Sequence, residues 1–346
     1  MNSVGFFDIQ KSMHKRSQFT KIQWQRKVPY AFIWYRRYSK KRLAQEISFK
    51  ELIMKKIKNI TFIGLGVMGF PMAGHLAKNS NYSVTVWNRT KERAEKWRNE
   101  FKGTIAKSIK ESIDNADVII LCDGKDEDVE QIIYSKNGIL QNISNNALVV
   151  DHTTTSYKLA QKLALSFKEK NVGFVDAPVS GGEVGAINGC LSVMAGGSEA
   201  DIKTAKLIIT SYAKSISHIG TSGYGQLAKM VNQICIAGVL QGLSDGILFA
   251  ENENIDIEML LCAISGGAAG SWQMDNRATT MSKREFDFGF AIKWMVKDLG
   301  YCLDRAKDNK TNLSFTKTVY DKYKKLVKSG DGQLDTSALI LQNKGE

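Results

Sequence analysis

Three glycines with the spacing of a dinucleotide-binding turn carry the clearest chemical signal in the sequence. Gly64, Gly66 and Gly69 follow a β-branched run at residues 60–63 and precede a helix-like segment, which is the context that the pattern G-x-G-x-x-G requires. The first glycine permits a tight bend, the second lets a pyrophosphate approach the backbone, and the third lets the helix pack on the strand. The N-terminus of that helix also attracts phosphate. The predicted phosphate-binding segment comprises Gly64, Leu65, Gly66, Val67, Met68 and Gly69.

The residues after the second predicted strand indicate which dinucleotide is bound. Asn88 lies 24 residues after Gly64 and is followed by Arg89 and Thr90. Sites that prefer NAD usually place Asp or Glu here to bind the ribose 2′-hydroxyl, and this segment contains neither. The planar guanidinium of Arg89 can bind a 2′-phosphate, and Asn88 and Thr90 can add neutral hydrogen bonds. We therefore expect NADP(H) as the preferred cofactor, with NAD(H) as the alternative.

A lysine on an apolar helix is the candidate for proton transfer. Residues 226–249 predict a long, nearly all-apolar helix, buried against the chain or against a second subunit. Loss of hydration there would lower the pKa of Lys229, which could then give a proton to a carbonyl oxygen, or remove it in the reverse direction. The alternative is a lysine whose amine extends to solvent. Asn232 and Gln233 lie on the same helix face, and either can bond a substrate hydroxyl; we favour Asn232.

A polar turn offers a site for an anion. Ser180, Gly181 and Gly182 follow a predicted strand, and the backbone N–H groups of such a turn can form an anion-binding concavity. A purely structural turn is the alternative. Backbone dipoles would let the chain bind an anionic substrate with few charged side chains.

Four separated motifs share their order with one enzyme family. They read IGLGVMGFPMA at residues 63–73, DAPVSGG at 176–182, GYGQLAKMVNQ at 223–233 and KDL at 297–299. Together they resemble the β-hydroxyacid dehydrogenases, in particular the 3-hydroxyisobutyrate dehydrogenases and the tartronate semialdehyde and glyoxylate reductases. The resemblance runs from about residue 60 to about residue 306. The decarboxylating phosphogluconate enzymes share these motifs, but their chains are much longer, and the helical part of this sequence is too short for that pattern.

The resemblance also implies roles for individual residues. On the substrate side, it implies that Ser180, Gly181 and Gly182 bind the carboxylate, that Lys229 is the general acid and base, and that Asn232 or Gln233 contacts the substrate. On the cofactor side, it implies that Thr154 lies near the nicotinamide and that Lys297 contacts the cofactor. Two positions depart from the family pattern. Family members often have proline six residues after the aspartate at position 151, where this chain has Tyr157, and they commonly have proline after a hydrophobic residue in the segment that here contains Cys122. No spacing of the four histidines suggests a metal site, so we expect metal-independent chemistry.

Short apolar runs alternate with helical stretches over the first part of the main body. The predicted strands are residues 60–63, 83–87, 118–121, 148–150, 172–175 and 191–195, and the predicted helices between them include 71–78 and 90–100. This alternation predicts an α/β Rossmann-type, doubly wound sheet over residues 59–222. Residues 223–346 predict an all-α C-terminal domain. The resemblance implies that this domain serves substrate binding and oligomerisation and that the two domains form a 6-phosphogluconate dehydrogenase-like fold.

The positive charge of the chain is concentrated at its N-terminus. The 346 residues carry a net charge of +13, and residues 1–58 contain 15 Lys and Arg but only three acids, so residues 59–346 are nearly neutral. We expect a poorly ordered basic extension. It is an incidental extension upstream of a natural start at Met54, a transit peptide formed by residues 1–53, or a nucleic-acid-binding arm. The first case predicts a cytoplasmic protein, and the second an organellar one, for example mitochondrial.

Composition excludes several classes. No stretch approaches 18 uninterrupted apolar residues, which argues against an integral membrane protein. The five cysteines are odd in number and form no CxxC pair, which argues against a disulfide scaffold and a structural zinc site. We expect a small carboxylate substrate and a homodimer or homotetramer, and we do not expect a nucleic-acid or membrane partner.

These observations predict an NADP-dependent oxidoreductase that interconverts a small β-hydroxy acid and its semialdehyde. 3-Hydroxyisobutyrate and methylmalonate semialdehyde are the preferred pair. Reduction of tartronate semialdehyde, succinic semialdehyde or glyoxylate is the alternative within the class. The alternative from another class is a non-catalytic dinucleotide-binding scaffold whose basic extension binds nucleic acid.

Overall fold

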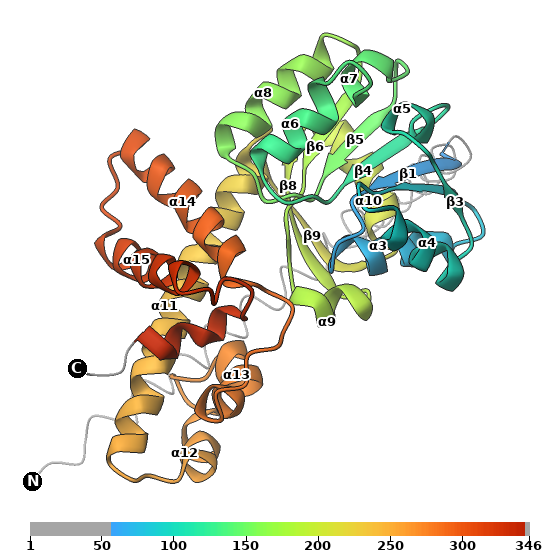
Figure 1. Ribbon diagram of the computed structural model, residues 1–346. Helices are drawn as coiled ribbons and strands as arrows, with labels where there is room; N and C mark the ends of the chain where they lie inside the picture. Colours follow the sequence, from blue (N-terminus) through green and yellow to red (C-terminus); the bar gives the residue numbers. More distant parts are fainter. Residues whose placement is uncertain (1–56, 343–346) are drawn as a thin grey trace, which may run out of the picture. The chain divides into compact units, whose positions relative to one another are not determined.

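The structure is a computed structural model that describes residues 57–342 (Figure 1). Residues 57–342 belong to one compact unit. The expected basic extension lies outside the described residues except for its last two positions, and so do residues 343–346.

A nine-stranded sheet forms the centre of the first part of residues 57–342. Its strands are β1 (Asn59–Ile63), β2 (Ser83–Trp87), β3 (Thr104–Ile105), β4 (Val118–Leu121), β5 (Leu148–Asp151), β6 (Gly173–Asp176), β7 (Val179–Ser180), β8 (Leu191–Gly197) and β9 (Ala213–Gly220). They lie in the order β3-β2-β1-β4-β5-β6-β8-β7, with β9 beside β8. The six strands from β3 to β6 are parallel, and β8 runs antiparallel to β6 and β7. The strands are added outward in one direction from β1 to β3 and in the other direction from β4 onward. At such a switch point, between β1 and β4, a crevice for a ligand opens at the carboxyl ends of the strands.

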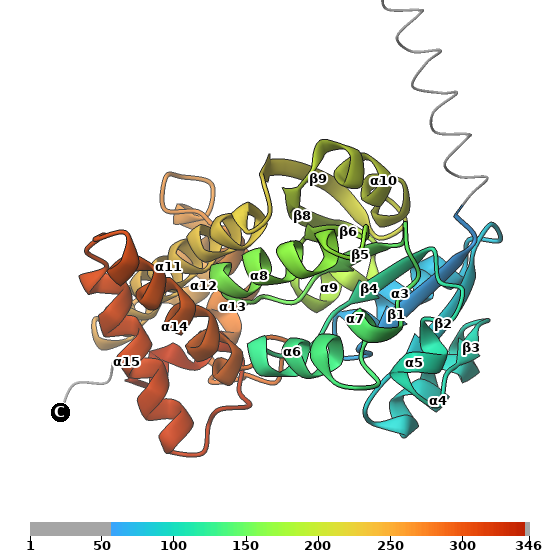
Figure 2. The same cartoon turned by 90° about the horizontal axis from the view of Figure 1, so that it is seen from above.

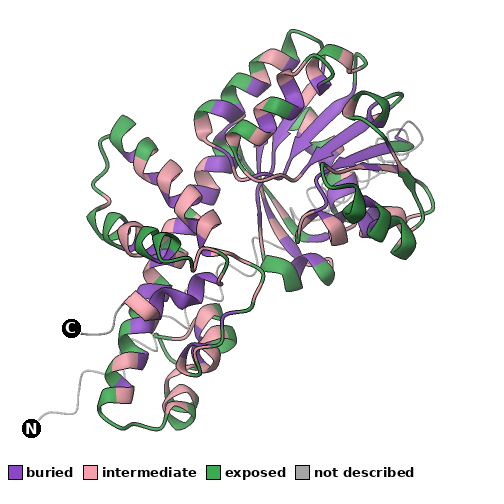
Figure 3. Ribbon diagram, in the orientation of Figure 1, coloured by how far each residue is buried: buried purple, intermediate pink, exposed green. Residues whose placement is uncertain are grey.

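Helices cover both faces of this sheet, which confirms the predicted fold class (Figures 1 and 2). Helices α3 (Gly69–Ala77) and α4 (Lys91–Glu100) follow β1 and β2, and α9 (Gly182–Ile187) packs on α3. The opposite face carries α5 (Ile109–Ser112), α6 (Asp126–Tyr134), α7 (Ile139–Asn142) and α8 (Tyr157–Lys168). Helix α10 (Glu199–Ile209) packs on β6, β8 and β9. Strands β4 and β5 are buried along their whole length (Figure 3), because apolar runs between two helical layers exclude water on both faces.

Three strands were not predicted. Strands β3 and β7 have two residues each, too few to show a hydrophobic period. Strand β9 is mostly exposed along the edge of the sheet, and its sequence AKSISHIG contains few apolar residues. The predicted strands 83–87 and 118–121 coincide with β2 and β4, and the other predicted strands differ by one or two residues at their ends.

The second part of the described chain is helical, as predicted. It contains α11 (Tyr224–Asn252), α12 (Ile257–Ile264), α13 (Trp272–Ser282), α14 (Ile292–Asp308), α15 (Ser314–Lys328) and the 3₁₀ helix η1 (Thr336–Gln342). Their apolar faces share one core, in which Leu240, Met295 and Tyr323 are almost completely buried. Helix α11 runs from the sheet through this core, so residues on its first turns can connect the two parts (Figure 1).

Helix α11 bears on two expectations, the absence of a membrane span and the burial of residues 226–249. It is long and apolar enough to cross a membrane by length and composition, although 44% of its most apolar window is buried inside the protein. The core helix of a soluble protein passes the same test. Within the described chain the expected burial holds for one face, because Val231 and Phe249 on the other face are 60% and 65% exposed. Burial of that face against a second subunit stays a prediction.

Candidate active site

The glycine turn between β1 and α3 has the geometry of a phosphate-binding loop. Gly64 has a φ of +95°, and a Cβ there would lie 2.2 Å from the carbonyl oxygen of Cys122. A Cβ on Gly69 would lie 1.9 Å from the carbonyl oxygen of Gly64. Around Gly66 no atom lies within 4 Å of the corresponding position, so the turn is open there. The residues present therefore fit the pyrophosphate of a dinucleotide, and the N–H groups that begin α3 face the same opening.

A cavity with a mixed apolar and charged lining adjoins this turn. It has a volume of about 540 Å³ and is lined by Leu65, Gly66 and Val67 on one side and by Arg93 and Lys96 of α4 on the other. The α4 residues that line it are two bases, Arg93 and Lys96, and one acid, Glu100, so this wall carries a net positive charge.

Asn88 braces the glycine turn. Its Oδ1 accepts a hydrogen bond from the backbone N of Leu65 at 2.8 Å, and its Nδ2 donates to the carbonyl oxygen of Thr90 at 2.8 Å. The side chain thus joins the end of β2 to the turn after β1. Asn88 and Thr90 lie beside the predicted phosphate-binding segment, as their place in the sequence predicts.

Arg89 has an anionic partner that the sequence analysis missed. Its Nη2 lies 2.8 Å from Oδ1 of Asp128 in the first turn of α6. The side chain of Arg89 is 60% exposed and that of Asp128 is 18% exposed. Three acids begin α6, namely Asp126, Glu127 and Asp128, but their sequence gave no sign that one of them reaches the loop after β2.

Lys229 is buried beside the polar turn. It is 8% exposed, and its Nζ donates a hydrogen bond to the carbonyl oxygen of Val179 at 2.9 Å. Burial lowers the pKa of Lys229 to about 8; Asp298 opposes this shift and the positive charge of Lys297 adds to it. An amine with such a pKa can give and take a proton near neutral pH.

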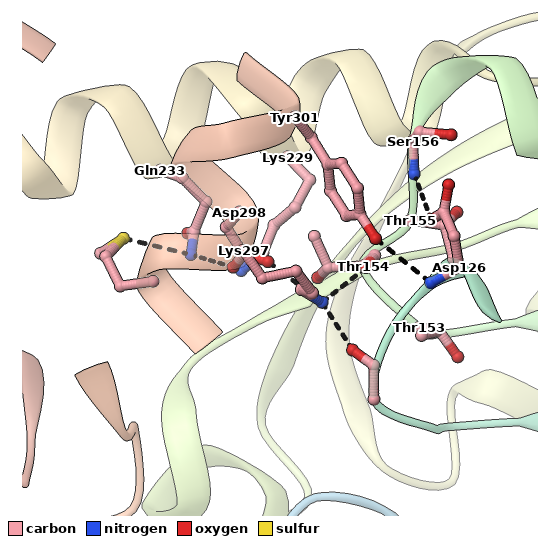
Figure 4. Close-up of polar contacts among 12 residues, drawn as sticks. Asp126, Thr153, Thr154, Thr155, Ser156, Lys229, Gln233, Lys297, Asp298 and Tyr301 are labelled. Carbon is pink, nitrogen blue, oxygen red and sulfur yellow. Dashed lines mark hydrogen bonds and ion pairs between the residues drawn. The ribbon is translucent and has the colours of Figure 1, made fainter. Parts of the chain in front are cut away.

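The polar turn and α11 are joined by hydrogen bonds. Ser180 Oγ donates to Asn232 Oδ1 at 3.4 Å, and Asn232 Nδ2 donates to Gln233 Oε1 at 2.7 Å. Gln233 Nε2 then donates to Asp298 Oδ2 at 2.7 Å (Figure 4). Asn232 is half-buried and faces Ser180, whereas Gln233 is only 1% exposed and faces α14.

The two glycines after Ser180 adopt backbone angles that favour glycine. Gly181 has a φ of +129° and Gly182 a φ of +63°, and no atom lies within 4 Å of a Cβ placed on Gly182. The turn therefore presents its backbone N–H groups at the start of α9 without side chains in the way. Such a turn can hold a carboxylate.

Lys297 reaches from α14 to the ends of β4 and β5. Its Nζ donates to the carbonyl oxygens of Gly124 and Thr154, both at 2.7 Å, and lies 3.2 Å from Asp298 Oδ1 (Figure 4). One turn later, the hydroxyl of Tyr301 accepts a hydrogen bond from the backbone N of Asp126 at 3.1 Å. The structure thus brings the predicted residues Thr154 and Lys297 into direct contact. Tyr301 was missed because nothing in the sequence distinguishes it from a core aromatic.

Two buried carboxyl groups end neighbouring strands below these loops. Asp151 and Asp176 are paired in register between β5 and β6, and both are at most 1% exposed. Burial raises the pKa of each to about 7. Asp151 Oδ1 accepts a hydrogen bond from Thr153 N at 2.9 Å. Each of these aspartates directly follows a short apolar run, and this pattern could have identified both positions in the sequence.

The predicted residues therefore form three groups. Ser180, Lys229 and Asn232 lie together at the start of α11, and the glycine turn lies with Asn88 and Thr90 at the ends of β1 and β2. Thr154 and Lys297 meet each other above β4 and β5, and Arg89 contacts Asp128. Over residues 57–342, no three His, Cys, Asp or Glu side chains are grouped so that they could hold a metal ion.

Two family models together cover the described chain. A model described as the NAD binding domain of 6-phosphogluconate dehydrogenase matches residues 59–220. A second, described as the NAD-binding domain of NADP-dependent 3-hydroxyisobutyrate dehydrogenase, matches residues 223–342.

Known proteins from several organisms are similar over most of their length. The probable 3-hydroxyisobutyrate dehydrogenase-like 1, mitochondrial, of Arabidopsis thaliana is 37% identical over 86% of this chain and 89% of its own. The 2-hydroxy-3-oxopropionate reductase of Escherichia coli is 32% identical over 81% of this chain and 94% of its own. A solved structure of Mycobacterium tuberculosis 3-hydroxyisobutyrate dehydrogenase has a TM-score of 0.75 and 26% identity, covering 84% of this chain and all of the other. With relatives of this identity matched almost end to end, the chain belongs to the β-hydroxyacid dehydrogenase family and is an NAD(P)-dependent oxidoreductase.

Proposed function

We propose that this protein interconverts a small β-hydroxy acid and its semialdehyde, with NADP(H) preferred over NAD(H) and Lys229 as general acid and base. One observation carries the proposal: the buried amine of Lys229 lies 2.9 Å from the carbonyl oxygen of Val179, directly before the turn Ser180–Gly182. A proton donor and a carboxylate-binding turn are thus adjacent.

The residues that would hold the cofactor lie along the carboxyl ends of the strands. The turn 64–69 would bind the pyrophosphate, Asn88, Arg89 and Thr90 the adenosine part, and Thr154 and Lys297 the nicotinamide part. Bound NADP(H) supplies or accepts a hydride. The open space at Gly66 and the net positive charge of the α4 wall, where Arg93 and Lys96 outnumber Glu100, support this placement.

The substrate would lie between the polar turn and α11. The N–H groups of Gly181 and Gly182 and the hydroxyl of Ser180 would bind its carboxylate, and Asn232 would bind its hydroxyl. Lys229 would give its proton to the carbonyl oxygen during reduction and remove it during oxidation. Gln233, held by Asp298, would keep Asn232 in place.

We place 3-hydroxyisobutyrate and methylmalonate semialdehyde first among the substrates. The printed names of the plant and mycobacterial relatives support them. The name of the E. coli relative, 2-hydroxy-3-oxopropionate reductase, supports the alternative of tartronate semialdehyde; succinic semialdehyde and glyoxylate remain in the same class. The mycobacterial structure is described with L-serine, which is also a carboxylate with a β-hydroxyl.

The same family membership supports further assignments. We propose a dinucleotide-binding domain over residues 59–222, a helical domain over 223–346, and a homodimer or homotetramer formed through apolar surface such as Val231, Phe249 and Met259. A start at Met54 would give a cytoplasmic protein, and a transit peptide would give a mitochondrial one, as the name of the plant relative states for that protein.

The test is a spectrophotometric assay with the full chain. NADPH and NADH oxidation would be followed with methylmalonate, tartronate and succinic semialdehydes and glyoxylate, and the reverse reaction with 3-hydroxyisobutyrate. We expect a rate with NADPH that is much faster than with NADH, and fastest with methylmalonate semialdehyde. Faster turnover with another semialdehyde would replace the substrate assignment, and equal rates with both cofactors would contradict the role of Arg89.

A further inference from the structure

A buried glutamine connects the group around Lys229 with the loop that carries Thr154. Gln226 lies one helical turn before Lys229 on α11 and has no exposed surface. Its Nε2 donates a hydrogen bond to the carbonyl oxygen of Thr153 at 2.8 Å, and its Oε1 accepts one from the backbone N of Thr155 at 3.1 Å. These two bonds flank Thr154, so the side-chain amide holds the backbone on both sides of that residue.

The helix that carries Gln226 is itself fixed to the sheet. The carboxylate of Asp176 accepts hydrogen bonds from the backbone N of Gly223 at 2.7 Å and of Gln226 at 3.0 Å. A Cβ at Gly225 would lie 2.5 Å from the carbonyl oxygens of Asp176 and Met194. The first turn of α11 therefore lies directly on β6 and β8 and has no room to slide.

The loop is held from a second helix as well. Lys297 of α14 donates to the carbonyl oxygen of Thr154 (Figure 4). This oxygen lies between the two backbone groups that Gln226 binds. The segment Thr153–Thr155 thus gives three backbone groups to two helices. Among the hydrogen bonds of residues 57–342, only those of Gln226 join this segment to α11. Lys229 lies one turn further along the same helix.

We propose that Gln226 is a positioning residue that sets the distance between the loop Thr153–Thr155 and the amine of Lys229. This inference rests on the proposed function, in which Thr154 contacts the nicotinamide and Lys229 moves the proton. Hydride and proton are exchanged at adjacent atoms of one carbonyl group, so the groups that hold the cofactor and the proton must be in register at the same moment. A misplacement of about 1 Å can cost about a hundredfold in rate.

Two substitutions separate the hydrogen bonds from the packing. Gln226→Met keeps the length of the side chain but can form neither bond. Gln226→Glu is the sharper variant: a neutral carboxylic acid accepts through its carbonyl oxygen and donates through its hydroxyl, as the amide does, whereas an ionised carboxylate cannot donate to Thr153. Burial raises the pKa of a carboxyl at such a site, so its titration falls in the accessible pH range.

The expected result is a pH-dependent rescue. We expect Gln226→Met to lower kcat about 10- to 100-fold with little change in KM and to raise the primary isotope effect with deuterated NADPH. The activity of Gln226→Glu, divided by that of wild type at the same pH, should rise as the pH falls, and the ratio for Gln226→Met should stay flat. A side chain that only stabilised the fold would lower the melting temperature without this pattern.

The ratio to wild type is needed because other groups nearby also titrate. The charged and ionisable groups nearest to Gln226 include Asp123 and Asp151, His152, Tyr157 of α8, Asp176 of β6, Lys229 of α11, and Lys297 and Asp298 of α14. All of them are present in the wild type and in both variants, so their common contribution cancels in the ratio.

Hydrogen exchange tests the loop contact without any turnover. In the cofactor-free protein, exchange measured by mass spectrometry should speed up in peptides containing Thr155 in Gln226→Met and remain unchanged in α13. Gln241→Met, which alters another buried glutamine of α11, is the matched control and should keep wild-type kcat.

Several outcomes would overturn the proposal. Wild-type kcat and isotope effect in Gln226→Met would do so, as would unchanged exchange at Thr155 or a flat pH ratio for Gln226→Glu. Failure of the proposed function itself looks different: Lys229→Met would then turn over normally, whatever the exchange at Thr155 shows.

Discussion

The amine of Lys229 donates a hydrogen bond to the carbonyl oxygen of Val179 across 2.9 Å, from helix α11 to strand β7. Ser180, which follows Val179, bonds Asn232 on the same helix. Two neighbouring residues of one strand therefore face two residues of one helix. This arrangement fixes the spacing between the proposed proton donor and the proposed carboxylate site, and a fixed spacing favours acids whose reacting carbon lies close to the carboxylate.

Replacing Lys229 tests its chemical role directly. We expect Lys229→Met to lower kcat about 10²- to 10⁴-fold in both directions, because general acid–base catalysis contributes about that factor. The dissociation constant for NADPH, measured by fluorescence titration, should change little, because Lys229 contacts Val179 and not the glycine turn. Wild-type turnover in this variant would remove Lys229 from the mechanism.

The pH dependence should have opposite signs in the two directions. Lys229 must be protonated to reduce a semialdehyde and neutral to oxidise an alcohol, and burial lowers its pKa to about 8. We therefore expect kcat/KM for reduction to fall as the pH rises through about 8, and kcat/KM for oxidation to rise through the same value. Initial rates between pH 6 and 10 measure both profiles. Two profiles with the same slope would assign the titration to another group.

The nucleotide-binding turn and most of the sheet could be predicted because local residues determine them. The bend after β1 needs a glycine at position 64, where φ is +95°, and buried strands such as β4 consist of consecutive apolar residues. Strand β9 could not be predicted, since its exposed edge position removes the hydrophobic pattern.

The contacts within the site depend on residues far apart in the chain. Arg89 and Asp128 are 39 positions apart, and Lys297 and Thr154 are 143 apart. Resemblance to the family indicated that Lys297 contacts the cofactor, but no local pattern pairs Arg89 with Asp128. Gln226 lies within a recognised motif, yet its two bonds to the loop 153–155 become visible only when β5 and α11 are packed together.

Asp151 should make the stability of the protein decrease toward alkaline pH. Burial raises its folded-state pKa from 3.8 to about 7, so its contribution to stability is fully present below about pH 4 and is lost as the pH rises through about 7. The free energy of unfolding of Asp151→Asn, relative to wild type, should therefore increase by at most about 3 kcal/mol between pH 5 and 8.

Urea denaturation at both pH values measures the effect of Asp151. The control is Asp304→Asn, which removes an aspartate whose side chain is 74% exposed. The control variant should follow the wild-type pH dependence. A constant difference between Asp151→Asn and wild type would show that Asp151 is ionised in the folded protein throughout this range.

The ion pair between Arg89 and Asp128 should limit the preference for NADP(H). Asp128 binds the guanidinium that we assign to the 2′-phosphate, and its own negative charge would repel that phosphate. Exposed ion pairs contribute up to about 1 kcal/mol, so Asp128→Asn should raise the ratio of kcat/KM for NADPH to that for NADH about two- to fivefold. Arg89→Ala should lower the same ratio. Glu127→Gln is the matched control, because it removes one negative charge from the same turn of α6 without touching Arg89, and it should leave the ratio unchanged. If Asp128→Asn lowered kcat/KM equally for NADPH and NADH, the ion pair would instead hold the adenosine part that both cofactors share, and Asp128 would have no role in the choice between them.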